Sequence, residues 1–217
     1  GWILMAKAGE QSLQRFLARE GAVSLDCASR FGEDLLYALE ELEERQILHR
    51  DLKPANLGVG AAAKKAHHLT LFDFSLALDL RSDRVSTAWR PQLSVGNAVY
   101  RDPFLRLRGA WDPAADRWSA AVTLHEMLTG VRPSFSVEGA AALEPEASIV
   151  LAAERFDASV REQLVTFFTR ALAREAAARF ESAAEMRKDW NRCFGPVLVV
   201  PATVAPRTAP PSEPEPA

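Results

Sequence analysis

The sequence predicts a mainly α-helical domain that carries one small β-hairpin. In residues 26–46, apolar side chains recur every three or four positions, which is typical of an amphipathic helix. Residues 113–129 form a second helical stretch that is apolar on more than one face, as expected for a central helix. Between them, residues 57–59 and 69–72 have strand character and are joined by an Ala/Lys/His-rich turn. Together these observations predict helices gathered around a single hairpin.

The beginning of the chain predicts the end of a strand followed by a short helix. Residues 1–5 are an apolar run that stops at Ala-Lys-Ala-Gly, where we expect a loop. A short helix should follow over residues 11–19. Because the chain opens at Gly1 within an apolar run, we interpret it as a piece excised from a longer protein.

The long helix has a start signal, and polar residues follow its end. Ser24 or Asp26 is placed to cap the first turn. A compact polar segment over residues 49–56 comes next and leads into the first hairpin strand. Polar residues are therefore expected at both ends of the hairpin.

A long irregular segment precedes the central helix. Residues 73–103 show no sustained period, and a loop of this length is usually functional or disordered. Asp112 or Pro113 opens the next helix, which should run to about Thr129 and end at Gly130.

The remaining chain predicts two helices and a linker. Helices fit residues 158–173 and 181–193. Seven prolines interrupt residues 196–217, so we expect this Pro/Ala-rich tail to be a disordered linker.

The composition fits one globular domain of 217 residues, of which 48% are hydrophobic and 25% charged. A net charge of -3 gives no argument for binding to nucleic acid or to an anionic membrane. Apolar stretches fall short of the roughly 18 residues of a membrane helix, and no export signal opens the chain. Cys27 and Cys193 are too few for a disulfide framework, so free thiols and a cytoplasmic location are expected.

The segment His-Arg-Asp-Leu-Lys-Pro-Ala-Asn at residues 49–56 is the strongest functional signal. A hydroxyl that attacks the terminal phosphate of ATP needs a carboxylate to accept its proton, a cation near the phosphoryl oxygens and oxygen ligands for Mg²⁺. Asp51, Lys53 and Asn56 supply these three functions. The segment is identified as the catalytic loop of eukaryotic-like serine/threonine protein kinases. A chance match is the alternative, and eight consecutive fitting positions argue against it.

The next motif, Phe-Asp-Phe-Ser at residues 72–75, resembles the kinase Asp-Phe-Gly motif. The resemblance implies that Asp73 is the chief Mg²⁺ ligand and faces Asn56, with Phe74 as a structural or regulatory residue. A lone Asp at a strand end is more often a turn former, but the catalytic loop sets the register here. Ser75 replaces Gly and removes backbone freedom, so we expect this loop to switch conformation less readily.

Residues 96–104, Gly-Asn-Ala-Val-Tyr-Arg-Asp-Pro-Phe, resemble the end of a kinase activation segment. Asn97 stands where the family has a Thr that hydrogen-bonds the catalytic Asp, and its amide could donate or accept there. Phe104 stands where the family has a Glu that pairs with an Arg, here Arg179. That pair cannot form, so Arg179 needs another partner or must reach water.

Asp116 begins Asp-Arg-Trp-Ser and matches the kinase Asp that accepts backbone amides of the catalytic loop. The simpler alternative is an acid in the first turn of a helix, favoured by the helix dipole. Residues 125–130 continue the resemblance. Together the motifs imply a kinase C-terminal lobe over residues 11–195, with residues 1–10 as the end of an N-lobe strand and the hinge.

The same resemblance places the hinge that binds adenine near the start of the chain, although a plain edge strand is the alternative there. Gly58 stands where many kinases have a bulky apolar residue beneath the adenine, which puts ATP affinity in doubt. The residues expected to bind ATP are Met5, Ala6, Ala8, Ser12, Lys53, Asn56 and Asp73.

Regulation is suggested by Arg50, because kinases with an Arg before the catalytic Asp often use it to grip a phosphate on the activation segment. Candidate phosphorylation sites are Ser82, Ser86, Thr87 and Ser94, which could equally be ordinary solvated hydroxyls. The residues with expected structural or regulatory roles are His49, Arg50, Phe74, Asn97, Asp116 and Arg179. His67 and His68 are adjacent, and we interpret them as hairpin-turn residues rather than as a metal site.

The sequence holds no Gly-rich phosphate loop, no phosphate-binding strand lysine and no partner Glu before the catalytic loop. The resemblance therefore implies a parent serine/threonine kinase that uses ATP and Mg²⁺ on a protein substrate. Its partners would be an N-terminal lobe and further domains of the same polypeptide, and this piece alone would have little or no activity.

Two other functions remain open. A pseudokinase or docking module is favoured by the substitutions already described, whereas the intact Asp51, Lys53, Asn56 and Asp73 count against it. A small-molecule kinase of the aminoglycoside type fits less well, because Lys53-Pro54 and residues 96–103 resemble kinases that act on peptides. Asp-Phe-Ser and Asp-Pro-Phe also resemble variants in large bacterial kinases of phage-defence systems.

Overall fold

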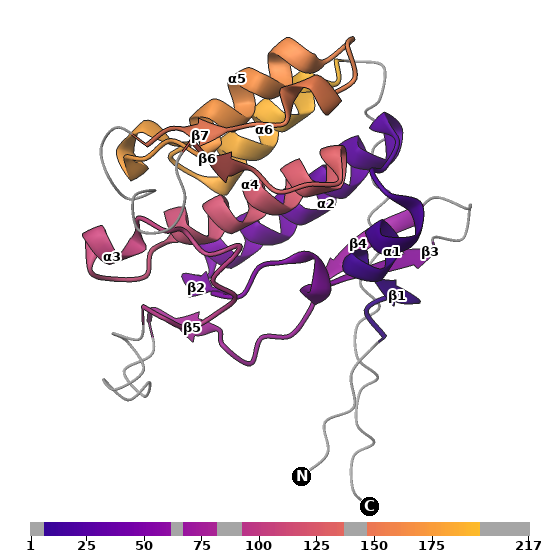
Figure 1. Cartoon of the computed structure of the whole chain (residues 1–217). Helices are drawn as coiled ribbons and strands as arrows, with labels where there is room; N and C mark the ends of the chain where they lie inside the picture. Colours follow the sequence, from indigo (N-terminus) through magenta and orange to yellow (C-terminus); the bar gives the residue numbers. More distant parts are fainter. Residues whose placement is uncertain (1–6, 62–66, 82–92, 137–146, 196–217) are drawn as a thin grey trace, which may run out of the picture.

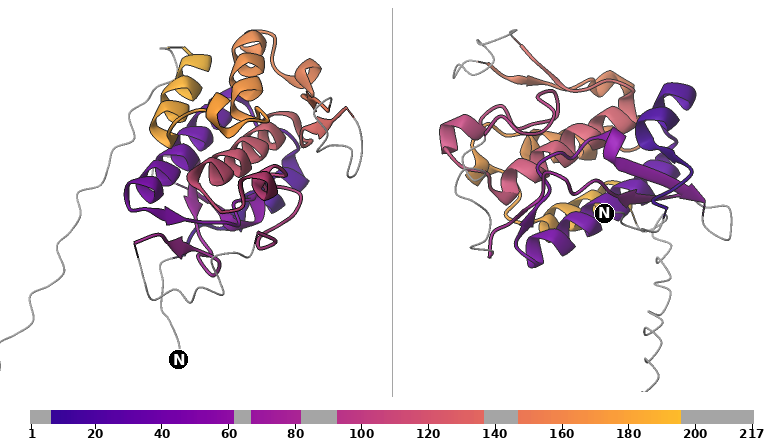
Figure 2. Two further views of the ribbon diagram at one scale, coloured as in Figure 1. Left: turned by 90° about the vertical axis from the view of Figure 1, so that its left-hand side faces the viewer. Right: turned by 90° about the horizontal axis from the view of Figure 1, so that it is seen from below.

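Two helices, α2 (Leu25–Glu44) and α4 (Pro113–Thr129), lie side by side at the centre of the computed structural model (Figure 1). The structure describes residues 7–61, 67–81, 93–136 and 147–195. Helices α5 (Arg161–Ala171) and α6 (Ala183–Cys193) cover one side of this pair, and the hairpin strands over residues 57–61 and 67–71 lie on the other side. The turned views in Figure 2 show the same arrangement, with α6 along α2. The described part is thus mainly helical, as the sequence predicts.

Local signals in the sequence start the helices. The Ser24 hydroxyl accepts the Cys27 N–H and caps α2, while the Asp112 carboxylate accepts the Ala115 N–H at 2.9 Å and caps α4. The helix α4 has Pro113 in its first turn and ends at Gly130, which adopts a left-handed conformation with φ of 75°. The ends of both long helices fall within two residues of the predicted positions.

The first short helix, α1 (Leu13–Glu20), begins two residues later than predicted, because Gln11 and Ser12 form strand β1. This strand pairs with β3 (Leu57–Ala61), which in turn pairs with β4 (His67–Leu71) in the predicted hairpin. All pairs are antiparallel, and Leu57 lies opposite Leu71.

Two further ladders were not predicted. Strand β2 (Ile47–Leu48) pairs with β5 (Leu78–Asp79). The predicted catalytic loop at residues 49–56, here called the catalytic segment, therefore starts at the end of β2 and leads into β3 of the other sheet. Strand β6 (Ser134–Phe135) pairs with β7 (Ile149–Val150). Each strand has two residues, too few to show the alternation of a strand. The short helix α3 (Leu105–Arg108) was likewise not predicted.

The core joins the helices to the hairpin. Its aromatic centre includes Trp190 of α6 and Phe167 and Phe168 of α5, and each of these side chains is at most 1% exposed. The Trp190 indole N–H donates to the Ser29 carbonyl oxygen of α2 at 3.1 Å. A Cβ added to Gly32 would collide with the Trp190 ring, so the glycine permits close approach of α2 and α6. This packing fixes the scaffold behind the catalytic segment.

The expected free thiols are present, because Cys27 and Cys193 are unpaired and buried. Burial raises the pKa of Cys27 to about 11 and that of Cys193 to about 12. Among the described residues, no helix has both the length and the apolar character required to cross a membrane. The predicted linker at 196–217 lies outside the described residues.

His125 joins α4 to two neighbouring segments. Its Nδ1 lies 2.9 Å from the Val131 carbonyl oxygen, and its Nε2 accepts the Ala152 N–H at 3.2 Å. A neutral ring with the proton on Nδ1 satisfies both contacts, whereas a second proton would face the Ala152 N–H. Burial lowers the pKa of His125, with the Val131 carbonyl acting in the opposite direction.

We therefore expect the His125 ring to stay neutral to lower pH than an ordinary histidine. A depressed pKa means that the His125 contribution to stability is complete above about pH 6.5 and is lost as pH falls through the folded-state pKa. Titration of the His125 ring signals by NMR measures this pKa. Protonation of His125 at or above pH 6.5 would refute the prediction.

Candidate active site

The predicted catalytic segment, residues 49–56, is anchored to helix α4 by a buried carboxylate. Asp116 is 1% exposed and accepts the N–H groups of His49 at 2.6 Å and Arg50 at 2.9 Å, one on each oxygen. Arg50 has a positive φ of 65°, a conformation that a non-glycine residue adopts only when its surroundings hold it there. The two hydrogen bonds to Asp116 do so, and they orient the residues that follow.

Burial raises the pKa of Asp116 to about 6, and the two backbone N–H groups oppose this shift. At neutral pH the carboxylate therefore keeps both oxygens available as acceptors. Asp116 is both a residue of the first helical turn and a structural support for the catalytic segment.

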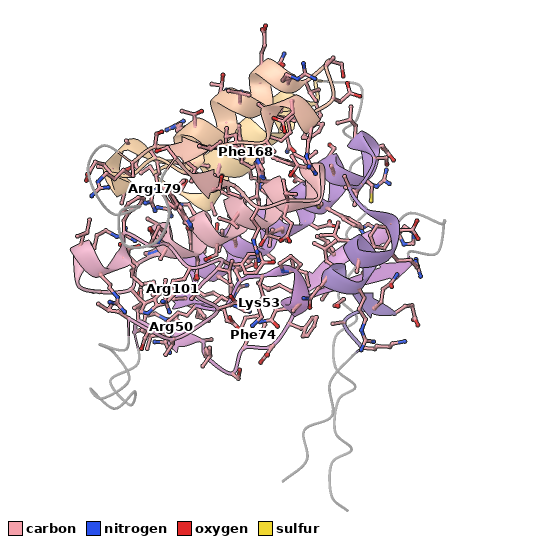
Figure 3. The ribbon with its side chains drawn as sticks, viewed as in Figure 1. Arg50, Lys53, Phe74, Arg101, Phe168 and Arg179 are labelled. Atoms are coloured by element: carbon pink, nitrogen blue, oxygen red, sulfur yellow. The ribbon has the colours of Figure 1, made fainter. Side chains whose placement is uncertain are left out.

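Three hydrogen bonds hold the Asp51 carboxylate in place. Its Oδ2 accepts Lys53 Nζ at 2.6 Å and Asn56 Nδ2 at 3.0 Å. Its Oδ1 accepts the backbone N–H of Asn97 at 2.9 Å. The carboxylate is thus held both by its own motif and by Asn97, which lies 46 positions further along the chain. The Asp51 side chain remains 10% exposed. Figure 3 shows Lys53 near Phe74, on the side of the structure away from α5 and α6.

The contact between Asn97 and Asp51 differs in its atoms from the expectation. The backbone N–H of Asn97 donates to Asp51, while the side-chain Oδ1 accepts the Val99 N–H at 3.0 Å. The preceding Gly96 has a φ of 79°, and an added Cβ would collide with the Arg50 carbonyl oxygen. Glycine therefore lets the two motifs touch through their backbones.

The hairpin brings the two predicted metal-binding residues to the same end. The Phe72 N–H donates to the Asn56 carbonyl oxygen at 3.0 Å, which places Asp73 directly beyond this contact. Asn56 is 5% exposed and uses its Nδ2 group on Asp51, so its side-chain oxygen is left to face a ligand. Hydrogen bonds from Ser75, chiefly from its side chain, lower the pKa of the exposed Asp73.

These two residues fit a magnesium ion by the chemistry of their donors. One ionised carboxylate and one amide oxygen are hard ligands, and Mg²⁺ usually takes one or two such protein groups together with waters and phosphate oxygens. Asp73 adopts a positive φ of 62°, which a short polar side chain tolerates better than most. The donor set supports magnesium better than a metal that prefers nitrogen or sulfur.

Ser75 does more than restrict the backbone. Its φ is not positive, so the glycine found in the related motif is not required by the backbone at this position. Its N–H donates to Asp73 Oδ1 at 3.3 Å, and its side chain also bonds that carboxylate. The sequence reasoning missed this contribution, although a Ser two residues after an Asp is a known turn signal.

His49 links the catalytic segment to the Asp73 motif. Its Nε2 lies 3.2 Å from the Phe72 carbonyl oxygen, and its ring contacts Phe74 edge-on with centroids 5.0 Å apart. Burial lowers the pKa of His49, so the neutral form predominates at neutral pH. Phe74 is otherwise 47% exposed. Phe74 is thus partly covered by His49 and partly exposed.

Arg50 points toward the start of the activation segment. Its Nε donates to the Leu76 carbonyl oxygen at 2.6 Å, and the residue is 4% exposed. Burial lowers its pKa, and the Asp116 charge opposes this shift. Ser94 is exposed, whereas Ser82, Ser86 and Thr87 lie outside the described residues. A phosphate-gripping role for Arg50 stays a prediction.

The described end of the predicted hinge, residues 7–10, lies directly on strand β3. A Cβ added to Gly58 would collide with the Ala8 carbonyl oxygen, so the backbone of Ala8 occupies the space beside Gly58. The Ser12 side chain accepts the Arg15 N–H at 3.3 Å and caps α1. Met5 and Ala6 lie outside the described residues. An adenine could not lie between Ala8 and Gly58 in this arrangement, which the sequence reasoning did not foresee.

Arg179 finds the partner that Phe104 cannot provide. Its Nη1 donates to Asp102 Oδ2 at 2.6 Å, and both side chains are at most 1% exposed. Arg108 donates to the same oxygen at 2.8 Å. Phe104 instead packs edge-on against Trp118, with ring centroids 5.6 Å apart. The sequence reasoning missed Asp102; the signal was an acid two residues before the substituted position.

The two hairpin histidines have separate neighbours. His67 contacts the Phe16 ring edge-on, and His68 Nδ1 lies 3.4 Å from Asp34 Oδ2. Asp34 also accepts the Leu69 N–H at 2.9 Å and so joins α2 to β4. An acid thus lies beside His68, which the sequence did not indicate.

Comparisons with known proteins agree with this arrangement. The model of the protein kinase domain family matches residues 2–191. The probable kinase PglW of Streptomyces coelicolor is 34% identical over 85% of this chain, and the serine/threonine-protein kinase PrkC of Bacillus subtilis is 25% identical over 89%. The serine/threonine-protein kinase gad8 of Schizosaccharomyces pombe is 32% identical over 62% of the chain.

The chain spans only part of each relative, namely 12% of PglW, 29% of PrkC and 20% of gad8. The bacterial relatives agree with the resemblance to bacterial kinases. With the matched domain covering most of its residues, this chain belongs to the protein kinase family and is similar to serine/threonine protein kinases of bacteria.

Proposed function

We propose that this chain forms the lobe of a serine/threonine kinase that holds the catalytic loop, and that the whole protein transfers the terminal phosphoryl group of Mg-ATP to a protein hydroxyl. One observation carries the proposal: the Asp51 carboxylate is held by Lys53, Asn56 and the Asn97 backbone while its side chain remains 10% exposed. A fixed, accessible carboxylate is what a hydroxyl nucleophile requires.

Each polar residue has a distinct part in this reaction. Asp51 would orient the substrate hydroxyl and accept its proton. Lys53 lies 2.6 Å from Asp51 and would place a positive charge beside the transferred phosphoryl oxygens. Oxygens of Asn56 and Asp73 would hold magnesium, which when bound offsets negative charge on the ATP phosphates. Asp116 acts through the His49 and Arg50 backbones and is a positioning residue.

A second lobe would complete the nucleotide site. The sequence contains no Gly-rich phosphate loop, and we propose that other residues of the whole protein supply it. Residues 11–195 would then be the C-terminal lobe, 1–10 the hinge and 196–217 a linker. ATP would bind near Ala8 and Ser12 only after Ala8 moved away from Gly58. The buried free thiols agree with a reducing, cytoplasmic location.

The contact between Ala8 and Gly58 also favours a second candidate, a pseudokinase that keeps the fold for protein interaction. The two candidates differ in nucleotide binding. A thermal shift of the full-length protein with Mg-ATP supports the kinase, because a ligand that binds only the folded state raises Tm. An unchanged Tm at millimolar Mg-ATP would favour the pseudokinase.

Replacing Asn56 with Ala in the full-length protein should raise the Mg²⁺ concentration required for half-maximal phosphoryl transfer. The substitution removes one oxygen ligand and also one donor to Asp51, so kcat should fall as well. Labelled phosphate transfer to a protein substrate, measured against Mg²⁺ concentration, provides both values.

Asn191→Ala is the matched control, because Asn191 also donates its side-chain amide to a carboxylate but lies in α6 on Glu33. Its Mg²⁺ dependence should equal that of the wild type. No ATP-dependent transfer by the wild-type full-length protein would overturn the proposed function. An unchanged Mg²⁺ dependence in Asn56→Ala would overturn the metal assignment alone.

A further inference from the structure

Three arginines lie near the turn that touches Asp51 and lack a carboxylate partner. The Tyr100 and Arg101 N–H groups both donate to the Asn97 carbonyl oxygen, at 3.1 and 3.0 Å, so residues 97–101 form one tight turn. Within the described residues, none of these three arginines forms an ion pair: Arg101, Arg106 and Arg132. Most other described arginines contact an Asp or Glu side chain.

The first arginine is fixed beside the turn. Arg101 Nη1 donates to the Val95 carbonyl oxygen at 3.1 Å, which orients the guanidinium without neutralising it. Burial lowers the pKa of Arg101, and the charge of Arg106 lowers it further. In the view of Figure 3, Arg101 lies in the same lower region of the molecule as Lys53. The Arg101 site is thus positive and has capacity for an anion.

The second arginine reaches the same turn from the end of α4. The Arg132 guanidinium lies 5.5 Å from the centre of the Tyr100 ring and also bonds the Tyr100 hydroxyl. The half-buried Glu126 carboxylate accepts the Tyr100 hydroxyl at 2.7 Å. Glu126 is therefore engaged by Tyr100, and Arg132 remains exposed beside it.

The turn also presents an apolar side chain. Val99 is 54% exposed and lies two residues after Asn97, whose N–H holds Asp51. A substrate with its hydroxyl at Asp51 would place its flanking residues along this turn, because three extended residues span about 10 Å. The bound substrate segment would then pass the positive charges of Arg101 and Arg132 and the apolar side chain of Val99.

We infer that this turn selects a protein segment in which acidic or already phosphorylated residues flank the phosphoacceptor hydroxyl. The inference rests on the proposed function and adds its substrate class. Arg101 and Arg132 are the residues that determine this specificity. Anionic side chains would complete the ion pairs that the described residues leave open, whereas Lys or Arg in the substrate would be repelled.

The experiment compares three peptides as substrates of the full-length protein. Each has one Ser, flanked by Asp and Glu, by Asn and Gln, or by Lys. We expect kcat/KM to be highest for the acidic peptide, by about two- to fivefold for each arginine engaged, as exposed ion pairs are weak. The advantage should shrink at 0.5 M salt because of charge screening.

Arg101→Gln and Arg132→Gln should lower kcat/KM for the acidic peptide toward the value for the neutral peptide. Arg15→Gln is the control, because Arg15 is exposed on α1 and also lacks an ion pair within the described residues. It should keep the acidic preference. Equal or higher rates with the basic peptide overturn the inference and leave the proposed function standing. No transfer to any peptide or protein substrate overturns both.

Discussion

Replacing Asp102 with Ala is expected to lower the free energy of unfolding by about 3–5 kcal/mol. The Arg179 and Asp102 side chains are 1% and 0% exposed, and their charged atoms lie 2.6 Å apart. Removing the acid leaves the Arg179 charge buried without its only described carboxylate partner. Three backbone carbonyl groups still accept from Arg179, and they are weaker partners than an ionised carboxylate. Unfolding in urea measures the change.

Two further variants distinguish the loss of the buried ion pair from a nonspecific loss of stability. Asp189→Ala removes the partly exposed partner of the exposed Arg192 and should cost less than about 1 kcal/mol. Combining Asp102→Ala with Arg179→Met removes both charges and should recover part of the lost stability, because an apolar pair carries no desolvation cost. A double variant less stable than Asp102→Ala alone would contradict this interpretation.

Replacing Asp51 with Asn in the full-length protein is expected to lower kcat by about 10²- to 10⁴-fold, the usual contribution of a general base. The amide keeps the shape of the side chain and could still accept the Asn97 N–H, but it cannot take a proton from the substrate hydroxyl. The affinity for Mg-ATP should change little, because the metal ligands we propose are Asn56 and Asp73. Rapid-quench measurement of transfer to a protein substrate gives the rate.

The control for Asp51→Asn is Asp157→Asn. Asp157 is exposed and bonds Ser159 in the loop before α5, so the same chemical change there should leave kcat unchanged. A wild-type rate in Asp51→Asn would rule out Asp51 as the base.

Helices were predictable because their signals are local. The apolar repeat of residues 26–46 and the caps at Ser24 and Asp112 lie within the segments that they specify, so the predicted ends are nearly correct. Strands β2 and β5 carry no such signal. Their two residues pair across 29 intervening positions because β3 and β4 return the chain to this place.

The sequence predicted those residues of the candidate site that lie within a single motif. Asp51, Lys53 and Asn56 lie within six residues, and the structure brings them into contact. The pairing of Asp102 with Arg179 joins residues 77 positions apart. Comparing position 104 alone with the kinase motif showed that the usual acid is missing there, but it could not show that Asp102 takes its place. Only a three-dimensional arrangement shows that an acid moved by two positions reaches the same buried arginine.

The approach of Ala8 to Gly58 was unpredictable for a different reason. The sequence showed that a side chain was missing at position 58, and it did not show what occupies the space. In the structure a neighbouring backbone does. Small residues specify close approach without identifying the partner, because any backbone can lie against them.

A double-mutant cycle on kcat tests most directly whether the catalytic segment acts as one unit. Asp51→Asn, Lys53→Met and the combined variant are compared in the full-length protein by rapid quench. Lys53 Nζ and Asp51 Oδ2 lie 2.6 Å apart and serve the same transition state, so the double variant should be about as slow as the slower single variant. Effects that multiply would show independent action and contradict the proposed site.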